Sequence, residues 1–436
     1  MSEQAARRTA VAPSRREFLK RSAAALSATS LAIGQSAHAA GSDVLKIGLI
    51  GCGGRGTGAA KNALDADPNV ELAALADVFA DRVGRSLKLL GAEYGERVKV
   101  PQDRQFVGFD AYQKLIASGV DVVLLATPPA FRPLHMRAAV EAGKHVFAEK
   151  SFATDGTAQR SMMESVELAK KKGLAIRSGL CFRFHPPHQE AFQRIHDGAI
   201  GDVLSIYVVR IGGSWGKYGL LEATGGQRPE GQSDLEWQLR NWYNFFWLSG
   251  GYMMDLGLHQ VDEIAWIQRE IPPVKCVASG GRQIPEYGNI YDHYDATFEY
   301  ADGLLAVFKI RGWSGCHSEF RLEIAGSKGR CSLTWSDATI RGATEWAYKG
   351  RPRAMHQIEH DELFRALRAG NPPNDGDSML KSNQMALMAR ESAHTGEQVT
   401  WEMATNSQQN LMPANLDWNM KLDVPPLTIP GITKFI

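Results

Sequence analysis

The chain has 436 residues, of which 44% are hydrophobic and 22% are charged, enough for two or three domains with sizeable cores. Its 49 Lys and Arg residues are balanced by 48 Asp and Glu residues, which argues against nucleic acid as a partner. The five cysteines are widely spaced and lack a C-x-x-C pair, so neither a disulfide framework nor a zinc site is indicated, although one disulfide is left open.

The N-terminal residues 1–39 have the pattern of an export signal. Ser14-Arg15-Arg16-Glu17-Phe18-Leu19-Lys20 precedes a weakly apolar stretch over 23–33 and the small-residue site Ala37-His38-Ala39. An ordinary basic N-terminus is the alternative. We expect a twin-arginine signal peptide, the twin-arginine translocase as a partner and a periplasmic location. No apolar run is long enough to span a membrane, so stable membrane insertion is not expected.

Residues 44–180 are predicted to form a Rossmann NAD-binding domain. Strand-like runs alternate with helical patterns such as 110–118 and 134–142. This alternation predicts a parallel sheet covered by helices on both faces. The expected strands are 45–50, 70–76, 120–126, 145–148 and 174–178.

A glycine-rich loop, Gly51-Cys52-Gly53-Gly54-Arg55-Gly56, follows the first of these strands. Its glycines allow a tight turn that brings backbone N–H groups to a pyrophosphate at a helix N-terminus, whereas a bare glycine turn is the alternative. Asp77 closes the second strand, where its carboxylate can accept hydrogen bonds from a ribose 2′-OH. Because that carboxylate would repel a 2′-phosphate and no Arg or Lys follows it before Arg82, NAD is expected rather than NADP.

Two later segments are expected at the same edge of the sheet. Thr127-Pro128 follows the third strand and Glu149-Lys150 follows the fourth. The carboxyl ends of parallel strands meet at one crevice, so these residues are predicted to line the cofactor site as well.

Residues 181–436 are predicted to form a second, α+β domain for substrate binding and oligomerisation. A helix is expected over 187–197, and helical periodicity returns over 356–396 with a break at 370–373. The strand-like runs lack crossover helices between them, which favours an open, mainly antiparallel sheet. They are 203–209, 274–280, 294–300, 304–310 and 319–325.

Asp255 and His259 are four residues apart in a helical pattern that continues to about Gln268, and therefore lie on one face. Gly257 between them costs about 1 kcal/mol of helix stability relative to Ala, which suggests that a cofactor or substrate approaches the backbone there. A surface Asp–His pair with a packing glycine is the alternative. A metal site is not expected because no third ligand is evident.

Aromatic residues cluster between 234 and 252 among amide and guanidinium groups, a composition that suits a sugar ring. Many of them are expected to belong to the core. Trp237, Trp242 and Tyr252 are our candidates for substrate contact, and Arg183 and His185 are expected to reach the same cleft.

These motifs together resemble the Gfo/Idh/MocA family, named for glucose-fructose oxidoreductase, inositol dehydrogenase and MocA. The resemblance covers essentially the whole sequence after the signal. It rests on 51–56, Ala126-Thr127-Pro128, Glu141-Ala142-Gly143-Lys144-His145-Val146, Glu149-Lys150, Arg183-Phe184-His185-Pro186, Asp255 with His259, and Glu391-Ser392-Ala393-His394-Thr395-Gly396. It implies catalytic roles for Lys150, Asp255 and His259, and pairing of open sheets in a homo-oligomer. One departure is that the family's Glu-Lys-Pro reads Glu149-Lys150-Ser151 here.

We therefore expect an exported NAD-dependent oxidoreductase that acts on a secondary hydroxyl of a sugar, cyclitol or glycoside. His259 would accept the hydroxyl proton, Lys150 would stabilise the alkoxide, and Asp255 would orient substrate or imidazole. The cofactor is expected to stay bound and to be recycled in place.

Two other classes remain open. One is a glycoside hydrolase that uses the same cofactor without net redox change and needs another base, for which Tyr243 and Tyr252 are candidates. The other is a protein that binds NAD and sugar without turnover, and Ser151 in place of proline is its sequence support.

Overall fold

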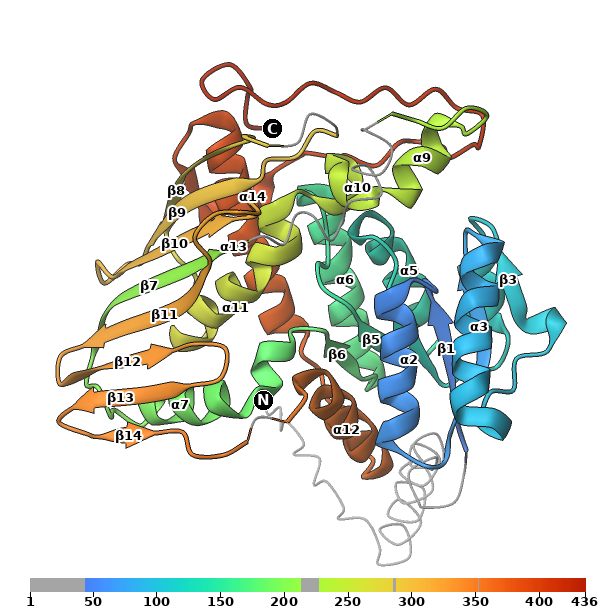
Figure 1. Cartoon of the computed structure of the whole chain (residues 1–436), viewed down its shortest axis with the longest axis horizontal. Helices are drawn as coiled ribbons and strands as arrows, with labels where there is room; N and C mark the ends of the chain where they lie inside the picture. Colours follow the sequence, from blue (N-terminus) through green and yellow to red (C-terminus); the bar gives the residue numbers. More distant parts are fainter. Residues whose placement is uncertain (1–43, 213–226, 285–287, 352) are drawn as a thin grey trace, which may run out of the picture.

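The computed structural model describes residues 44–212, 227–284, 288–351 and 353–436, which form two sheet-containing domains (Figure 1). The expected signal peptide lies outside the described residues. Within the described part of the chain, no helix is long and apolar enough to cross a membrane. All five cysteines are free, so the disulfide left open by the sequence is not formed.

The first domain contains a six-stranded parallel sheet in the order β3-β2-β1-β4-β5-β6, which confirms the predicted Rossmann topology. The short edge strand β3 was not predicted, because its three residues carry no apolar pattern. The strands are β1 (Leu45–Ile50), β2 (Val70–Asp77), β3 (Gln105–Val107), β4 (Val122–Leu125), β5 (His145–Ala148) and β6 (Ile176–Ser178).

Helices cover both faces of this sheet, as its nearly continuous apolar strands require. One face packs against α2 (Gly54–Ala66) and α3 (Ala80–Tyr94), and the other against α4 (Ala111–Ala117), α5 (Arg132–Glu141) and α6 (Gly156–Lys172). A helix from the far end of the chain joins the first face. This helix, α12 (Met355–Arg368), buries Leu363 and Phe364 in the same core as α2, so the Rossmann domain includes a segment outside 44–180.

The second domain is built on a nine-stranded sheet in the order β14-β13-β12-β11-β7-β10-β9-β8-β15. Among its paired strands only β7 and β10 run parallel, which confirms the mainly antiparallel prediction. The strands are β7 (Val203–Ile211), β8 (Lys275–Gly281), β9 (His293–Glu299), β10 (Leu305–Arg311), β11 (Glu319–Gly326), β12 (Gly329–Leu333), β13 (Ala338–Gly342), β14 (Trp346–Ala347) and β15 (Val399–Thr400).

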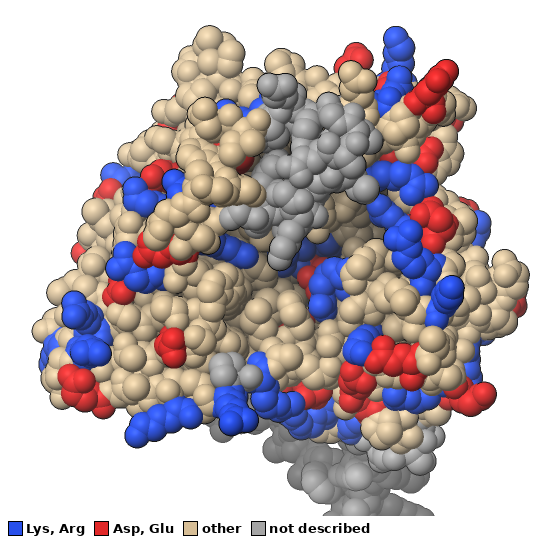
Figure 2. All heavy atoms as spheres, viewed as in Figure 1, with Lys and Arg blue, Asp and Glu red and all other residues tan. Residues whose placement is uncertain are grey.

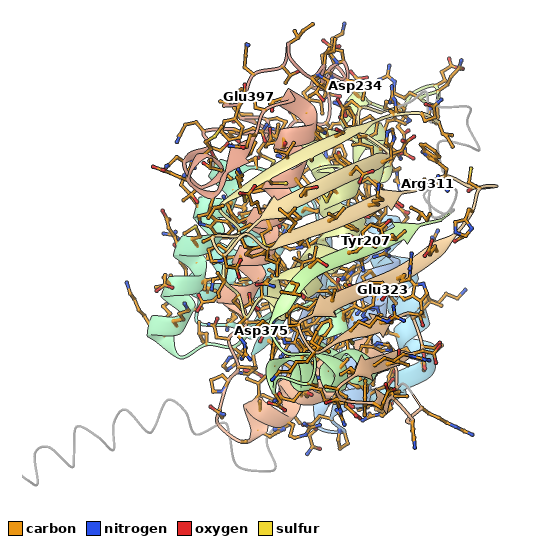
Figure 3. The ribbon with its side chains drawn as sticks, turned by 90° about the vertical axis from the view of Figure 1, so that its left-hand side faces the viewer. Tyr207, Asp234, Arg311, Glu323, Asp375 and Glu397 are labelled. Carbon is orange, nitrogen blue, oxygen red and sulfur yellow. The ribbon has the colours of Figure 1, made fainter. Side chains whose placement is uncertain are left out.

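One face of this sheet packs against α7 (Pro186–His196), α11 (Leu258–Ile267) and α13 (Gly376–Thr395). The opposite face is open toward the viewer in Figure 3, where Tyr207 and Glu323 are labelled on neighbouring strands. Cross-strand ion pairs such as Lys309–Asp295, at 3.0 Å, lie on this open face. Exposed apolar side chains lie among these charges, including Val277 at 53% and Leu305 at 44% exposure.

The helix predicted from 252 onward is interrupted. Residues Met253–Gly257 form a single π-helical turn, η8, and α11 begins only at Leu258. A Cβ at Gly257 would lie 2.8 Å from Met253 Sδ and 3.2 Å from the Phe308 ring. The predicted close approach at Gly257 is therefore made by core side chains, not by a ligand.

The remaining helical elements lie between or beside the two domains. They are α9 (Asp234–Arg240), the 3-10 turn η7 (Trp242–Asn244), α10 (Phe246–Ser249) and the 3-10 turn η5 (Cys181–Phe184), with α14 (Trp401–Asn406) near the end of the chain. The 3-10 turns η2 (Gly95–Arg97), η3 (Gln102–Arg104) and η4 (Pro129–Phe131) belong to the first domain. After α14, residues 407–436 run without helix or strand across the molecule toward α9 (Figure 1). Leu411, Leu416 and Trp418 of this tail pack against a cluster that contains Phe79, Leu235 and Leu239.

Candidate active site

The glycine-rich loop between β1 and α2 borders a cavity of about 520 Å³ at the carboxyl ends of the strands. Gly51 adopts a φ of +100°, and a Cβ there would lie 2.6 Å from the Ala126 backbone. A Cβ at Gly56 would lie 1.8 Å from the Gly51 carbonyl oxygen. At Gly53 and Gly54, by contrast, an added Cβ would meet nothing within 4 Å, so these two positions leave room for a ligand beside the start of α2.

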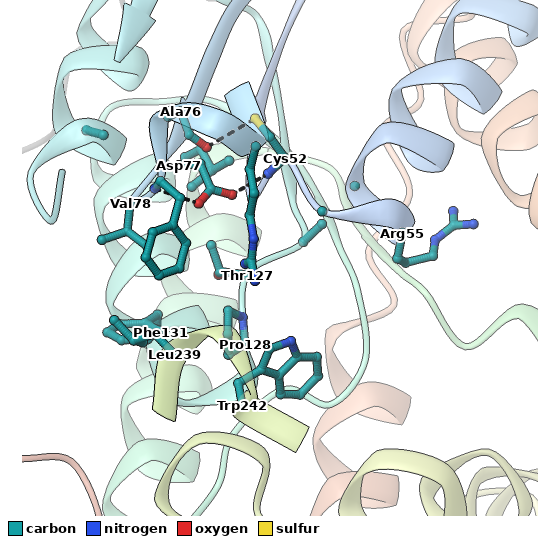
Figure 4. A pocket seen from close by; sticks show the side chains of 18 of the residues that line it. Cys52, Arg55, Ala76, Asp77, Val78, Thr127, Pro128, Phe131, Leu239 and Trp242 are labelled. Atoms are coloured by element: carbon teal, nitrogen blue, oxygen red, sulfur yellow. Dashed lines mark hydrogen bonds between the residues drawn. The ribbon is translucent and has the colours of Figure 1, made fainter. Parts of the chain in front are cut away.

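Asp77 closes β2 inside this cavity (Figure 4). Its two carboxylate oxygens accept hydrogen bonds from the backbone N–H of Cys52, at 2.7 Å, and of Phe79, at 3.0 Å. Burial raises the pKa of Asp77, while Arg82 and these N–H groups oppose the rise. A carboxylate has further lone pairs, so Asp77 can still accept a ribose hydroxyl while its orientation is fixed by the loop.

Thr127 and Pro128 lie across the cavity from Asp77, as predicted. The Arg55 side chain extends away from Asp77 in Figure 4, and its Nε donates to Glu149 Oε1 at 2.6 Å. Glu149 and Lys150 do not line the cavity. Glu149 instead fixes Arg55, together with Glu359 of α12, whose pKa is raised to about 7 by burial.

Lys150 reaches across to the second domain. Its Nζ donates to Asp255 Oδ1 at 2.8 Å and to the Asp255 carbonyl oxygen. The next residue makes a parallel contact, because Ser151 Oγ donates to the Met254 carbonyl. The Lys150–Ser151 peptide bond is cis. Two consecutive residues of the β5 loop are thus bonded to two consecutive carbonyls of the π-helical turn.

Arg132 holds this loop from the other side. Its guanidinium donates to the carbonyl oxygens of Thr127 and Ser151, so it joins the loops after β4 and β5. Burial, at 2% exposure, lowers the pKa of Arg132 to about 10. Sequence reasoning missed this residue, although a charged residue between the apolar segments Pro128-Pro129-Ala130-Phe131 and Pro133-Leu134 was a visible signal.

His259 is 8% exposed and stands near Lys150 and Arg210. Burial lowers the pKa of its imidazole well below the usual value, and both cations, with His356, add to this effect. Its Nδ1 is buried without a hydrogen-bond partner among the described residues. The surface-pair alternative for Asp255 and His259 is wrong because both are buried, and the carboxylate of Asp255 is bonded to Lys150.

The sequence of this two-domain chain matches one protein family in both halves. Residues 45–180 match the oxidoreductase family with an NAD-binding Rossmann fold, and residues 188–332 match the GFO/IDH/MocA C-terminal domain. The chain belongs to the Gfo/Idh/MocA oxidoreductase family.

Members of this family that are similar to the chain differ in their reactions. An inositol 2-dehydrogenase from Rubrobacter xylanophilus is 26% identical over 77% of this chain and 87% of its own length. A 2,7-anhydro-N-acetylneuraminate hydratase from Escherichia coli is 24% identical over 66% of this chain and 70% of its own. A solved levoglucosan dehydrogenase, in complex with NADH and levoglucosan, shares the fold with a TM-score of 0.65 at 18% identity, covering 82% of this chain and 99% of that one.

The candidate substrate residues of this Gfo/Idh/MocA protein are not gathered at one place. Arg183 forms ion pairs with Asp262, at 2.7 Å, and with Glu270, at 2.6 Å. These two carboxylates neutralise its charge within the protein. Trp237 packs on Phe245 in an apolar cluster rather than in the cleft.

The other three candidates also have assigned neighbours. Tyr252 is 3% exposed and packs against Gly312 in the core. Trp242 stacks on Tyr243 at 3.7 Å, and both line the cofactor cavity. The Nδ1 atoms of His185 and His188 lie 2.6 Å apart. Burial and the neighbouring His188 lower the pKa of His185 to about 4.

The described residues contain no cluster of three or more His, Cys, Asp or Glu side chains that could hold a metal ion. Charged side chains of both signs are interspersed over the face drawn in Figure 2, which is hollowed between the two domains. The chemistry available at the site is therefore that of Lys150, Asp255 and His259 beside a nucleotide-sized cavity.

Proposed function

We propose that the protein is an exported, NAD-dependent oxidoreductase that acts on a secondary hydroxyl of a sugar, cyclitol or glycoside and keeps its cofactor between turnovers. The observation that carries the proposal is the Lys150–Asp255 pair near a buried His259. Arg132 joins the loop of Lys150 to Thr127 of the cavity with the glycine-rich loop. Inositol and levoglucosan dehydrogenases among the similar proteins support the substrate class.

Each of these residues has a role in alcohol oxidation. Bound NAD supplies the acceptor for the hydride that leaves the carbinol carbon. The neutral imidazole of His259 accepts the hydroxyl proton, which its lowered pKa permits at neutral pH. The ammonium group of Lys150 stabilises the developing alkoxide, and Asp255 holds that ammonium in place.

Asp77 supports NAD as the cofactor because its fixed carboxylate would repel a 2′-phosphate. Arg82 and Arg85 line the same cavity and would favour a phosphate, so Asp77 and the arginines act in opposite directions. The proposal gives priority to Asp77, since both of its oxygens are fixed by backbone donors and it sits at the end of β2.

Enclosure of the cavity supports retention of the cofactor. Arg240 of α9 crosses from the second domain, pairs with Asp81 at 3.2 Å and lies 3.9 Å above the Phe79 ring. From the C-terminal tail, Trp418 packs on Phe109 with ring centroids 4.9 Å apart. Phe79 and Phe109 line the cavity. The cavity is therefore enclosed by the Rossmann domain with support from α9 and from the C-terminal tail.

Export and oligomerisation belong to the same proposal. The twin-arginine pattern supports export to the periplasm, and changing Arg15 and Arg16 to Lys should leave active, cofactor-loaded protein in the cytoplasm. The open sheet face supports a homo-oligomer, which a sedimentation measurement of the mass in solution would test.

The deciding experiment combines the released cofactor with the fate of the hydride. Mass spectrometry of the denatured protein should identify NAD, and turnover should proceed without added NAD. With substrate deuterated at the oxidised carbon, the label should appear in a second, reduced product. Stoichiometric consumption of free NAD with release of NADH would instead indicate an ordinary dehydrogenase.

A redox-neutral glycoside hydrolase is the second candidate, favoured by the hydratase among the relatives, because adding water causes no net oxidation. Of the two candidate bases, Tyr243 lines the cofactor cavity whereas Tyr252 is buried in the core, so Tyr243 is the better candidate. In that case the deuterium would remain in the sugar released from the glycoside. Sugar products with no change in oxidation state, lost in Tyr243→Phe, would favour this class.

A further inference from the structure

An exposed tryptophan stands near the proposed base, outside the region that the sequence indicated for substrate. Trp335 occupies the turn between β12 and β13, on the side of the sheet that faces the Rossmann domain (Figure 1). Trp335 is 49% exposed and is the one exposed tryptophan among the described residues. A single exposed apolar side chain is common on protein surfaces, but an indole at this place offers a flat apolar face on which a ligand ring can stack.

The turn holds the indole in one orientation. The backbone N–H of Thr334 donates to the Asp337 carbonyl at 2.8 Å, and Ser336 Oγ donates to the Asp337 carboxylate at 2.9 Å. Beneath the indole, the Phe320 ring is stacked at a centroid distance of 4.1 Å. Trp335 is therefore fixed before any ligand arrives, which lowers the entropic cost of binding.

Phe182 connects this indole to the catalytic residues. Its ring centroid lies 5.6 Å from that of Trp335 and 5.3 Å from the His259 imidazole. Trp335 is thus separated from the base by the width of one aromatic ring. A substrate whose reacting hydroxyl meets His259 would reach Trp335 only with a part that extends beyond the reacting ring.

Polar groups accompany this aromatic surface. The Arg210 guanidinium lies 5.5 Å from the Trp335 ring, and its Nη1 donates to Gln260 Oε1 at 2.8 Å and to the Leu256 carbonyl. Arg210 and the half-buried His356 are both near enough to His259 to lower its pKa. An apolar ring face bordered by hydrogen-bond donors is the surface that a pyranose recognises, since its C–H face is apolar and its rim carries hydroxyls.

We propose that Trp335, with Arg210, forms a second sugar subsite, so that the substrate is a glycoside of at least two rings whose non-reacting ring stacks on this indole. The inference rests on the proposed function, because it takes His259 as the place of reaction. It replaces Trp237 and Tyr252, which the structure places in apolar clusters, as the aromatic contact for substrate.

The test compares two-ring and one-ring sugars on full-length, NAD-loaded protein. The probes are glucosyl, galactosyl and mannosyl disaccharides and the corresponding methyl monoglycosides. Calorimetry gives the dissociation constants, the absorbance of the bound nicotinamide reports its reduction, and the amount of sugar product formed gives turnover. Trp335→Ala should weaken disaccharide binding about tenfold and leave methyl glycoside binding and kcat unchanged, while Trp335→Phe should retain most of the affinity.

Trp346 provides the matched control, because it is a partly buried tryptophan on the neighbouring strand β14, under Arg194 at 4.3 Å. Trp346→Ala should bind both classes of sugar as the wild type does. Equal losses for one-ring and two-ring sugars in Trp335→Ala would overturn the proposal, as would wild-type binding by that variant or a wild type that binds no disaccharide more tightly than its methyl glycoside. A change in oligomeric mass without a change in sugar binding would assign Trp335 to a subunit contact and overturn it as well.

The outcomes separate this inference from the proposed function. Disaccharide binding that depends on Trp335 without any reduction of bound nicotinamide would support the subsite and contradict the oxidoreductase activity on these sugars. Oxidation of methyl glycosides that is indifferent to Trp335 would support the activity and reject the subsite.

Discussion

The cofactor half and the catalytic half of the site are built by different means. Around the cofactor cavity, shape is set by the backbone: Gly51 and Gly56 admit no side chain, and Asp77 is fixed by backbone N–H groups. In the catalytic half, position is set by side chains that cross between domains, such as Lys150 to Asp255 and Ser151 to Met254. Added side-chain volume should therefore disrupt the cofactor half, whereas loss of a single polar contact should disrupt the catalytic half.

The largest effect is expected at His259. His259→Ala should lower turnover roughly 10²–10⁴-fold, the usual contribution of a positioned acid–base group, while NAD stays bound. Lys150→Ala should act similarly. Steady-state rates and the cofactor content of each purified variant provide the measurement. Rates near those of the wild type in both variants would mean that the chemistry lies elsewhere.

Glycine substitutions should separate shape from contact in the cofactor half. Gly56→Ala places a Cβ 1.8 Å from the Gly51 carbonyl oxygen, so the free energy of unfolding should fall by about 1–3 kcal/mol, even in protein stripped of NAD. In Gly53→Ala, the matched control, the added Cβ meets no atom within 4 Å. This variant should leave the free energy of unfolding unchanged while weakening the binding of NAD. Denaturant unfolding and cofactor titration measure the two effects. Equal stability losses would contradict the distinction.

Removal of the tail contact should release the cofactor without affecting chemistry. Trp418→Ala removes the ring that packs on Phe79 and Phe109, and dissociation of NAD should become about tenfold faster at unchanged kcat. Chase of bound NAD with a labelled competitor measures the rate. An unaltered rate would show that the tail does not retain the cofactor.

The smallest expected effect is on the pH dependence of stability, through the buried His360 of α12. Burial lowers the pKa of His360 well below its usual value, and neither ring nitrogen has a hydrogen-bond partner among the described residues. Below about pH 6.5 the unfolded state therefore takes up a proton that the folded state does not, so this contribution to stability is lost as the pH falls. Between about pH 6.5 and 5.5 the wild type should lose roughly 1 kcal/mol more than His360→Phe. Urea unfolding at both pH values checks the difference, and parallel pH profiles would contradict it.

The sequence predicted most of what depends on local pattern. Both sheets, the glycine-rich loop and the positions of Asp77, Lys150, Asp255 and His259 could be placed from spacing and from the family resemblance. The π-helical turn at Met253–Gly257 and the packing of α12 on α2 depend on neighbours distant in sequence, and no local signal announces them.

The substrate residues were the hardest to place. The aromatic cluster at 234–252 looked suited to sugar, yet Trp237 and Tyr252 pack inside apolar clusters because aromatic composition cannot distinguish a core from a ligand surface. Arg132 and Trp335 were overlooked for the opposite reason. Each owes its setting to tertiary contacts, namely two loop carbonyls for Arg132 and the Phe320 ring for Trp335.

The C-terminal tail also sets an order of assembly. The cavity is lined by residues between Ile50 and His135 and by residues 239–243, whereas Trp418 of the tail packs against the lining residues Phe79 and Phe109. Residues 407–436 follow every segment that lines the cavity in the chain, so they can pack behind Phe79 and Phe109 only after those segments have been made. The backbone N–H of Gln408 donates to the carbonyl of Ile436, and the side-chain amide of Gln238 in α9 donates to that of Leu422, so the tail is held to itself and to α9 by hydrogen bonds.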